Sequence, residues 1–418
     1  MGRTVALDAA GTEVARRAFR RYYAEHPPSP PPRLARREFA TFSFEAPTVM
    51  HRHTALPTAE AFGGFFRREE TPRHVYYSSA YYERPAHARM AEKEWRGADL
   101  IFDLDADHLR HAEGLDYPSQ LRLVKERFRA LLDEFLFGDF GIDPASTTLV
   151  FSGGRGYHAH VREEGYLGLS SIERRELVEY VLGSEVDPAA AVRSEGVGPS
   201  PVPADRPLGG RHRPPASFQR LADPTEGGWP GRISRSFLLL LDRWAAEGVA
   251  AAAEEIEGWG FPPRKARQIA KALLDADRGR SIREGLTLEV FDGPVPEGFL
   301  RAALDRARIE VQGETDAPVT TDIHRLIRLP GSLHGGTGLR VLPISRDALE
   351  AFEPLRDAVA PGTGSDPIRV TASATVRYPF GDGILEARAG ETVELAPSAA
   401  VFLLLRGEAT VTPPGAPS

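Results

Sequence analysis

Two aspartates at alternate positions end an apolar run of this sequence, and their spacing points to metal chemistry. The run is Leu-Ile-Phe-Asp-Leu-Asp, residues 100–105, which is typical of a buried strand. Because side chains i and i+2 of a strand project from the same face, Asp103 and Asp105 stand side by side. Two carboxylates so placed repel each other unless a cation lies between them, and hard cations such as Mg²⁺ take oxygen ligands. We therefore predict a divalent-metal site, with Asp107 beyond the strand in a loop role.

A glycine-rich turn, Ser-Gly-Gly-Arg-Gly-Tyr-His, lies between two predicted strands at 147–152 and 157–161. Its backbone N–H groups, hydroxyl, guanidinium and imidazole together suit a triphosphate, and a plain hairpin would not require them. The predicted phosphate-binding residues of the turn are Ser152, Gly153, Arg155 and His158. By the two-residue period of a strand, His160 shares the face of His158 and is a weaker second candidate. Metal-binding carboxylates beside a phosphate site indicate nucleotidyl transfer.

A third polar region, residues 315–338, carries acidic and basic side chains among small residues. Asp316 and Asp322 are both candidates for a third carboxylate, and their chemistry alone does not choose between them. The basic candidates of this region are Arg325, Arg328 and His334. The alternative interpretation is a surface loop that contains two arginines.

The composition bounds the class of protein. With 418 residues, 41% hydrophobic and 27% charged, the chain is typical of a globular protein of roughly two to three domains. It has no run of eighteen apolar residues and no apolar signal core near its start, so we expect no membrane span and a cytoplasmic location. The net charge of −7 argues against tight unaided binding of nucleic acid. The absence of cysteine excludes disulfides and Cys-ligated zinc or iron–sulfur sites, which leaves Asp, Glu and His as metal ligands.

Periodicity along the chain predicts both helices and strands. Helical spacing of apolar residues marks 11–25 and 118–137, and aromatic-rich stretches at 37–56 and 74–82 are typical of strands. The predicted organisation is a catalytic domain in two parts, 1–186 and 278–350, a Pro/Gly/Arg-rich loop at 187–232, a helical insertion at 233–277, and a small β appendage at 366–418. Within the insertion, residues 256–274 loosely resemble a helix–hairpin–helix that binds backbone phosphates, but two prolines favour an ordinary helix turn.

Taken together, the motifs resemble those of the small catalytic subunit of the archaeal–eukaryotic DNA primases. The similarity rests on residues 102–105, 152–158 and 325–334, whose order and spacing agree with the family, and it covers residues 34–345. Elements nearer the N-terminus also look like the family's nucleotide site, namely Arg37-Glu38-Phe39, Arg52 and Tyr77-Ser78. The resemblance implies an α/β (α+β) fold with a mixed, mostly antiparallel sheet core.

The resemblance also assigns roles to the candidate residues. It implies that Asp103, Asp105 and Asp316 are catalytic and hold Mg²⁺ or Mn²⁺, which makes Asp322 structural. The residues that it places on the phosphates of the incoming nucleotide are Ser152, Gly153, Arg155, His158, Arg328 and His334. The implied reaction is attack of a 3′-hydroxyl on the α-phosphate of a nucleoside triphosphate, directed by a single-stranded DNA template. Its product would be a short primer for DNA replication.

One feature of the family is missing, and one partner is implied. Family members commonly carry a zinc knuckle after the paired aspartates, but residues 106–120 contain no Cys. His108 and His111 therefore lack soft partners, and we expect no structural zinc. The resemblance implies a heterodimer with a large primase subunit, which carries an iron–sulfur cluster and supports initiation and template binding.

Two other functions are compatible with these motifs. The family includes primase–polymerases of DNA repair and translesion synthesis, which is the alternative enzyme. A non-catalytic nucleic-acid-binding or scaffold protein is a different class of function. The complete set of three aspartates argues against that class, because a decayed site would have lost at least one of them.

Overall fold

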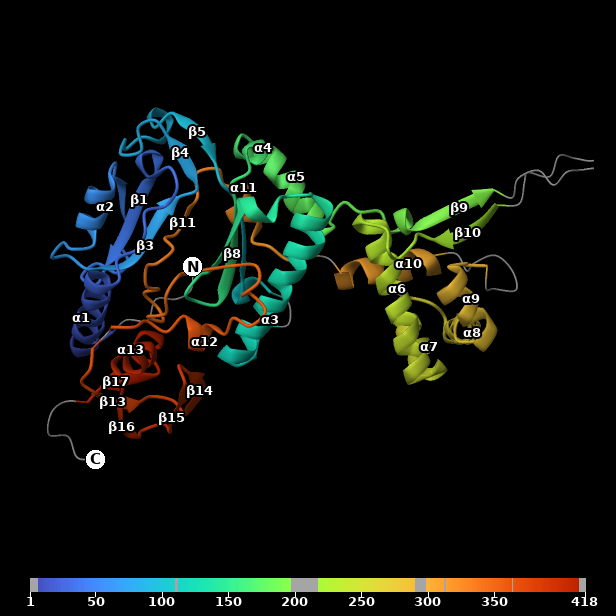
Figure 1. The fold of residues 1–418 in the computed structure, drawn as a ribbon. Helices are drawn as coiled ribbons and strands as arrows, with labels where there is room; N and C mark the ends of the chain where they lie inside the picture. Colours follow the sequence, from blue (N-terminus) through green and yellow to red (C-terminus); the bar gives the residue numbers. More distant parts are fainter. Residues whose placement is uncertain are drawn as a thin grey trace, which may run out of the picture. The chain divides into compact units, whose positions relative to one another are not determined.

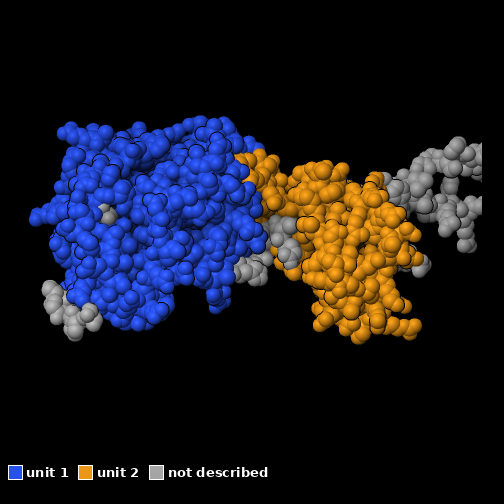
Figure 2. Space-filling view, turned by 60° about the horizontal axis from the view of Figure 1, so that its bottom comes forward, with its two compact units in different colours: residues 1–132, 141–178, 314–418 blue, residues 133–140, 179–313 orange. Residues whose placement is uncertain are grey.

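The computed structural model describes residues 7–109, 112–196, 217–289, 298–311, 313–362 and 364–412 (Figure 1). The chain forms two compact units, which Figure 2 distinguishes by colour. Unit 1 comprises residues 1–132, 141–178 and 314–418, and unit 2 comprises residues 133–140 and 179–313. Every strand pair in the described part of the chain is antiparallel, which confirms the predicted mixed fold with a mostly antiparallel core.

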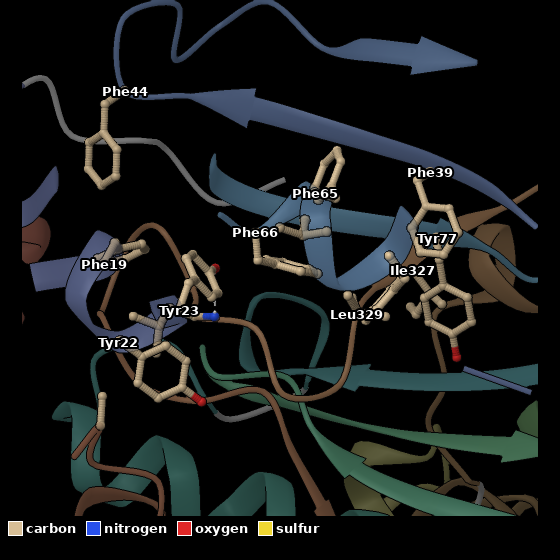
Figure 3. Packing of buried hydrophobic residues seen from close by; sticks show 14 of the residues in the cluster. Phe19, Tyr22, Tyr23, Phe39, Phe44, Phe65, Phe66, Tyr77, Ile327 and Leu329 are labelled. Carbon is tan, nitrogen blue, oxygen red and sulfur yellow. Dashed lines mark hydrogen bonds between the residues drawn. The ribbon is translucent and has the colours of Figure 1, made fainter. Parts of the chain in front are cut away.

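The first sheet of unit 1 has the strand order β11-β3-β1-β2. Its strands are β1 (Glu38–Ser43), β2 (His51–Ala55), β3 (Pro72–Ser78) and β11 (Leu326–Arg328). Helices α1 (Ala9–Glu25) and α2 (Ala59–Phe65) contribute rings to an aromatic core on this sheet, part of which Figure 3 shows. There Phe19 of α1 packs edge-on against Phe44, and Phe39 of β1 packs against Phe62 of α2. Every residue of β3 is buried, including the polar Arg73, His74 and Ser78.

The second sheet of unit 1 carries the two main motifs and has the order β12-β7-β8-β6. Its strands are β6 (Leu100–Asp105), β7 (Thr147–Phe151), β8 (Gly156–Val161) and β12 (Leu342–Ile344). Helix α3 (Tyr117–Ala130) packs on it, with Phe128 stacked on Tyr157 at 5.4 Å between ring centroids. Residues Leu131–Asp139 continue this helix with π-helical geometry. The helix predicted at 118–137 and the strands predicted around the glycine turn are therefore confirmed.

The C-terminal part of unit 1 differs from the small β appendage that was predicted at 366–418. It does contain the three-stranded sheet β16-β13-β17 and a hairpin, with strands β13 (Ile368–Ala372), β14 (Val376–Phe380), β15 (Gly383–Ala387), β16 (Thr392–Leu395) and β17 (Ala409–Val411). However, the buried helix α13 (Pro397–Arg406) lies between the last two strands. Pro397 starts it and Gly407, with φ 74°, ends it, and its apolar residues run without the alternation of a strand. Residues 413–418 lie outside the described residues.

Unit 2 is mostly helical. Its helices are α6 (Gly228–Glu247), α7 (Val249–Gly258), α8 (Pro263–Leu273), α9 (Ala276–Gly285) and α10 (Phe299–Val311). The insertion predicted at 233–277 lies within this set. The loop predicted at 187–232 is wrong at both ends, because strands β9 (Val192–Gly196) and β10 (Ser217–Leu221) pair there and α6 begins at 228. Residues 197–216, the centre of that predicted loop, lie outside the described residues.

The remaining elements are short. They are β4 (Ala80–Tyr82), β5 (Trp95–Ala98), α4 (Glu164–Leu167), α5 (Ser171–Leu182), α11 (Ala317–Thr321), α12 (Pro354–Asp357), and 3₁₀ turns at Leu34–Arg36, Met90–Glu92, Ala106–His108, Pro144–Ser146 and Pro188–Ala191. None of the helices in the described part of the chain combines the length and apolar character that a membrane crossing needs.

A buried carboxylate, Asp99, links the first and second sheets of unit 1. It lies between β5 and β6, and its Oδ2 accepts from Nη2 of Arg37 at 2.9 Å; neither side chain has any exposed surface. Arg162, just after β8, donates its Nε to the same oxygen at 3.2 Å, and Tyr81 of β4 donates its hydroxyl to Oδ1. Arg174 of α5 donates to the Asp99 carbonyl at 2.9 Å. Elements from four parts of the sequence are thus fixed around one charge.

Removal of this charge is expected to destabilise unit 1 strongly. In an Asp99→Ala variant, Arg37 would remain buried without its carboxylate, which typically costs about 3–5 kcal/mol of unfolding free energy. The midpoint of denaturant unfolding measures the loss. The control is Glu13→Ala, which removes the exposed partner of Arg16 on α1 and should change the midpoint little. Equal midpoints for the two variants would contradict the role given to Asp99.

Candidate active site

The pairing of β6 with β8 sets the first half of the site. In this register Asp103 lies opposite His158, and Asp105 lies opposite Gly156. Within β6 only the two aspartates are partly exposed, and the intervening residues are buried. This burial pattern confirms that the two carboxylates share one face of the strand. A Cβ at position 156 would lie 2.5 Å from the carbonyl oxygen of Leu104, so only glycine fits opposite Asp105.

Asp316 reaches this face from a distant part of the sequence. Its backbone N–H donates to the Asp103 carbonyl at 2.7 Å, and the Thr315 hydroxyl donates to the same oxygen at 3.3 Å. Asp316 occupies the N-cap position of α11, yet its side chain makes no capping hydrogen bond to the helix. Its carboxylate is therefore free to serve the site, with Nε2 of His108 3.7 Å away.

Asp322, the other candidate third carboxylate, lies at the opposite end of α11. It is exposed and accepts a hydrogen bond from the backbone N–H of His324 at 2.9 Å. That contact forms a local turn, a common structural use of aspartate. Of the two candidates, Asp316 is the one that a backbone hydrogen bond joins directly to β6.

The electrostatics at Asp103 favour a cation. Burial, followed by the charges of Asp105 and Asp316, raises the pKa of Asp103 to about 8, although Arg325 and Arg328 oppose the shift. Oδ1 of Asp103 lies 3.3 Å from Nε2 of His158. Burial, together with the same two arginines, lowers the pKa of His158 to about 3. Both groups thus prefer their neutral forms. A divalent cation would stabilise the ionised form of Asp103 against its burial and against the repulsion of Asp105 and Asp316.

The carboxylates are close enough to affect one another, but they do not form a closed ligand shell. No group of three or more His, Asp or Glu side chains in the described part of the chain is arranged to hold a metal ion as the side chains stand. The donor chemistry fits a hard cation, since the candidates offer carboxylate oxygens. Binding would require side-chain rotation at Asp105 or Asp316, both of which keep some exposure.

The glycine turn between β7 and β8 is held by its own serine. Ser152 Oγ accepts the backbone N–H groups of Gly154 at 3.2 Å and Gly156 at 3.1 Å. Gly153 has φ 76°, and a Cβ there would lie 2.7 Å from Cβ of His334. We predicted that the Ser152 hydroxyl contacts a phosphate. In the structure its oxygen instead accepts two backbone N–H groups of the turn and so shapes it.

Arg155 links the turn to the acidic motif. Its Nη2 donates to Oδ2 of Asp107 and lies 3.9 Å from Oδ1 of Asp105. The guanidinium keeps 29% of its surface exposed, so it is accessible to a ligand. Asp107, for which a loop role was predicted, lies in the 3₁₀ turn Ala106–His108 and forms an ion pair with Arg155.

The third region brings Arg328 and His334 to the same side of the unit. Arg328 of β11 has Nη1 2.8 Å from Nδ1 of His74 and lies over the ring of Tyr76 at 5.1 Å. His334 packs against the glycine turn, and its Nδ1 accepts the N–H of Gly336 at 3.2 Å. Because Nδ1 accepts this hydrogen bond, the proton of the neutral ring is assigned to Nε2. Nε2 lies beside the turn: a Cβ at position 154 would be 3.0 Å from it. Burial and nearby arginines hold the pKa of His334 well below its ordinary value.

Two histidines have roles that sequence patterns did not indicate. His74 of β3 is buried, and its Nδ1 also accepts the N–H of Gly335 at 3.3 Å, so it orients Arg328 and the backbone beside His334. No motif marks it, because a lone His in an aromatic strand is more typical of a core position. His160 is such a core residue, with Nδ1 3.2 Å from the Tyr77 hydroxyl and its ring stacked on that tyrosine.

Arg325 is the basic residue of the third region with the fewest contacts. Its guanidinium forms no hydrogen bond or ion pair with any described residue. Nevertheless its charge lowers the pKa of both Asp103 and His158. The proximity of this cation to the aspartates could not be inferred from its position in the sequence.

Comparison with known proteins identifies the family. The family model for the DNA primase small subunit matches residues 102–346, which include all three motifs. The chain belongs to the DNA primase small-subunit family. It is 37% identical to the DNA primase small subunit PriS of Methanocella arvoryzae, over 95% of this chain and 98% of that protein. It is 38% identical to the protein of the same name from Methanothrix thermoacetophila, over 97% of this chain and all of that protein.

A third relative, the DNA primase small subunit PriS of Natronomonas pharaonis, is 40% identical over 83% of this chain and 85% of that protein. The resemblance and the enzyme class inferred from the sequence are thereby confirmed. This primase small subunit is a DNA-directed nucleotidyltransferase that synthesises primers for DNA replication. The alternative of a repair or translesion primase–polymerase is not favoured, since the relatives are named as primase small subunits.

The raised pKa of Asp103 predicts a stability that depends on pH. The pKa of this carboxyl is about 8 in the folded protein and 3.8 in the unfolded chain. Between these pH values the unfolded chain loses the proton more readily than the folded protein, so the free energy of unfolding falls as pH rises. In metal-free protein, Asp103→Asn should therefore raise the melting temperature at pH 8 and change it little near pH 4. With 16% of the side chain exposed, water screens part of the charge, and we expect a gain of about 1–3 kcal/mol.

Thermal unfolding in a chelating buffer across this pH range measures the effect. Asp382→Asn, an exposed position in the β14–β15 turn, is the control that removes the same charge. A pH-independent difference between wild type and Asp103→Asn would contradict the shifted pKa.

Proposed function

We propose that primer synthesis by this chain uses two divalent cations, Mg²⁺ or Mn²⁺, held by Asp103, Asp105 and Asp316. The observation that carries this proposal is the effect of Asp105 and Asp316 on the pKa of Asp103, which indicates three clustered carboxylates. The hydrogen bond from the Asp316 N–H to the Asp103 carbonyl supports it, because it fixes the third carboxylate beside the strand. When bound, the cations would activate the 3′-oxygen of the growing strand and offset charge on the leaving pyrophosphate.

The chain's own residues would orient the nucleotide. We assign Arg155, Arg328 and His334 to its triphosphate as donors that surround the glycine turn, with Nε2–H of His334 as the donor from the imidazole. His158 adjoins Asp103, and its Nδ1 is buried without a partner among the described residues, so it is a further candidate donor. Ser152 and Gly153 would act through the shape of the turn, in which Ser152 Oγ already holds the N–H groups of Gly154 and Gly156.

Orientation is the main contribution that these residues can make to the chemistry. Nucleotidyl transfer requires the attacking 3′-oxygen and the leaving pyrophosphate to lie in line with the α-phosphorus. The basic donors would hold the triphosphate from one side, and the cations on the three carboxylates would hold it from the other. Together they would keep the α-phosphorus in line with the two oxygens. His74, which contacts Arg328 and the 334–336 segment, would position the donors without touching the nucleotide.

A large primase subunit is the partner that we propose. The relatives are named small subunits, which supports a second chain in the functional enzyme. The net charge of −7 supports it as well, since a chain with an acidic excess gains affinity for DNA by joining a basic or DNA-binding partner. The partner would supply the template contacts that initiation needs.

Primer synthesis on an unprimed single-stranded template tests the metal site. With labelled nucleotides, Mg²⁺ or Mn²⁺ and the large subunit present, Asp316→Asn should lower product by at least about a hundredfold, as should Asp103→Ala. Asp322→Asn is the matched control, six residues away, and should stay close to wild type because its carboxylate only shapes a turn. Excess chelator should abolish synthesis by wild type.

The opposite ranking of the Asp316 and Asp322 variants would reassign the third carboxylate. Synthesis that survives complete chelation would exclude the two-metal mechanism. Extension of supplied primers without any new primers, even with the large subunit present, would contradict primer initiation by this chain.

The role of Arg155 makes a separate kinetic prediction. Arg155→Ala removes a guanidinium that would bind the nucleotide equally in the ground and transition states, so KM for the nucleotide should rise roughly tenfold with a smaller change in kcat. Steady-state kinetics at saturating template measures both constants. Arg122→Ala, on the exposed face of α3, is the control. A normal KM together with full activity would remove Arg155 from the phosphate site.

A further inference from the structure

Helix α8 of unit 2 presents basic side chains that no acidic side chain among the described residues neutralises. Its residues run Pro-Arg-Lys-Ala-Arg-Gln-Ile-Ala-Lys-Ala-Leu and contain no acidic residue. The exposed cations of the helix are Arg264, Lys265, Arg267 and Lys271. None of the four forms an ion pair or a hydrogen bond with a described residue, although Lys265 lies 5.8 Å from the ring centre of Phe261. Within the described part of the protein, these four charges therefore have no structural partner.

Several other cations of the protein form ion pairs. Elsewhere in unit 2, Arg232 contacts Asp139 at 2.8 Å, Arg243 contacts Glu255 at 2.8 Å, and Arg283 contacts Asp242 at 2.6 Å. The chain has four lysines, and two of them are on α8. The other two are held internally: Lys93 is buried beside Glu38, and Lys125 donates to the carbonyl of Phe352 and the carboxylate of Glu353.

The packing of α8 fixes which face is presented. Ala266, Ile269, Ala270 and Leu273 are buried, which leaves the basic residues on the outside. Arg264, Arg267 and Lys271 follow each other at intervals of three and four, so they form one row about 10 Å long. A row of this length matches more than one phosphate of a nucleic-acid strand.

The turn before α8 adds aromatic surface next to this row. Trp259 and Phe261 are partly exposed, and they are anchored by Phe299, whose ring centre is 6.1 Å from each of theirs. Bases of a single strand can stack on exposed rings, whereas the paired bases of a duplex cannot. Basic side chains beside such rings favour a single-stranded ligand.

The contact would differ from that of a helix–hairpin–helix, which the sequence of this segment loosely resembles. In that motif the backbone N–H groups of the turn face phosphate, but here those of Trp259 and Gly260 are bonded to the carbonyls of Ile256 and Glu257. Pro262 and Pro263 have no N–H to donate. The exposed side chains are therefore the main groups left to bind the backbone of a strand.

We propose that the surface formed by Trp259, Phe261, Arg264, Lys265, Arg267 and Lys271 binds single-stranded DNA through its phosphates and bases. The ligand is inferred from the excess of positive charge in a chain of net charge −7 and from the adjacent aromatic rings. Exposed Glu254 and Glu257 on the neighbouring helix α7 repel phosphate, so the strand follows α8 and does not cross the helix pair. This surface is separate from the residues assigned to nucleotide and metal.

Binding of a labelled oligothymidylate of about 20 nucleotides to the full chain tests the proposal, and anisotropy across a salt series provides the readout. A variant with Arg264→Gln, Arg267→Gln and Lys271→Gln should bind roughly tenfold or more weakly. The slope of log K against log salt should become shallower by about 2, since each phosphate contact on a single strand contributes about 0.7. The variant changes only exposed side chains.

The control variant carries Arg67→Gln, Arg175→Gln and Arg388→Gln, three exposed arginines of unit 1 with the same total charge change. An equal loss of affinity in this control, or an unchanged Kd and slope in the α8 variant, would overturn the proposal. If the α8 variant lost as much affinity for duplex DNA as for the single strand, the assignment of a single-stranded ligand would be overturned. The assay needs no metal or nucleotide, so its outcome is independent of the active-site proposal.

Discussion

The buried Asp99 carboxylate is the interaction on which unit 1 depends most. A charge without contact with water is tolerated only when opposite charges and donors surround it, and here two arginines and a tyrosine do so. The partners lie just before β1, within β4 and just after β8, so the requirement to satisfy Asp99 also dictates how those elements meet. The strand with the catalytic candidates begins at the next residue, Leu100, and its position is therefore set by this group.

Neighbouring residues use buried charge in the same way. Glu38 is fully buried and contacts Nζ of Lys93 at 3.2 Å and Nε of Arg52 at 3.1 Å. Burial raises the pKa of Glu38, but its hydrogen bond to Arg52 and the nearby Lys93 charge outweigh this, and the net pKa is lowered. The N-terminal residues that resemble a nucleotide site in sequence thus include buried structural charges, of which Arg37 and Glu38 are the clearest.

The sequence predicted the site where spacing alone determines geometry. Asp103 and Asp105 share a face because a strand has a period of two, and the glycine turn beside them is recognisable from its composition. The contacts of Arg155 with Asp107 and of His74 with Arg328 could not be predicted in this way, because they depend on tertiary packing between separate segments. Helix α13 was missed for a related reason: its apolar residues are buried on every side, so it lacks the periodicity by which a surface helix is recognised.

The contact of Ser152 with its own turn has a consequence for the energetics of ligand binding. A segment with glycines at 153, 154 and 156 has an unusually large conformational entropy when it is unrestrained. Two hydrogen bonds to Oγ of Ser152 restrict it during folding, before any nucleotide arrives. The turn is therefore preorganised, so the free energy of the phosphate contacts proposed for it would appear largely as affinity and would not be consumed in ordering the loop.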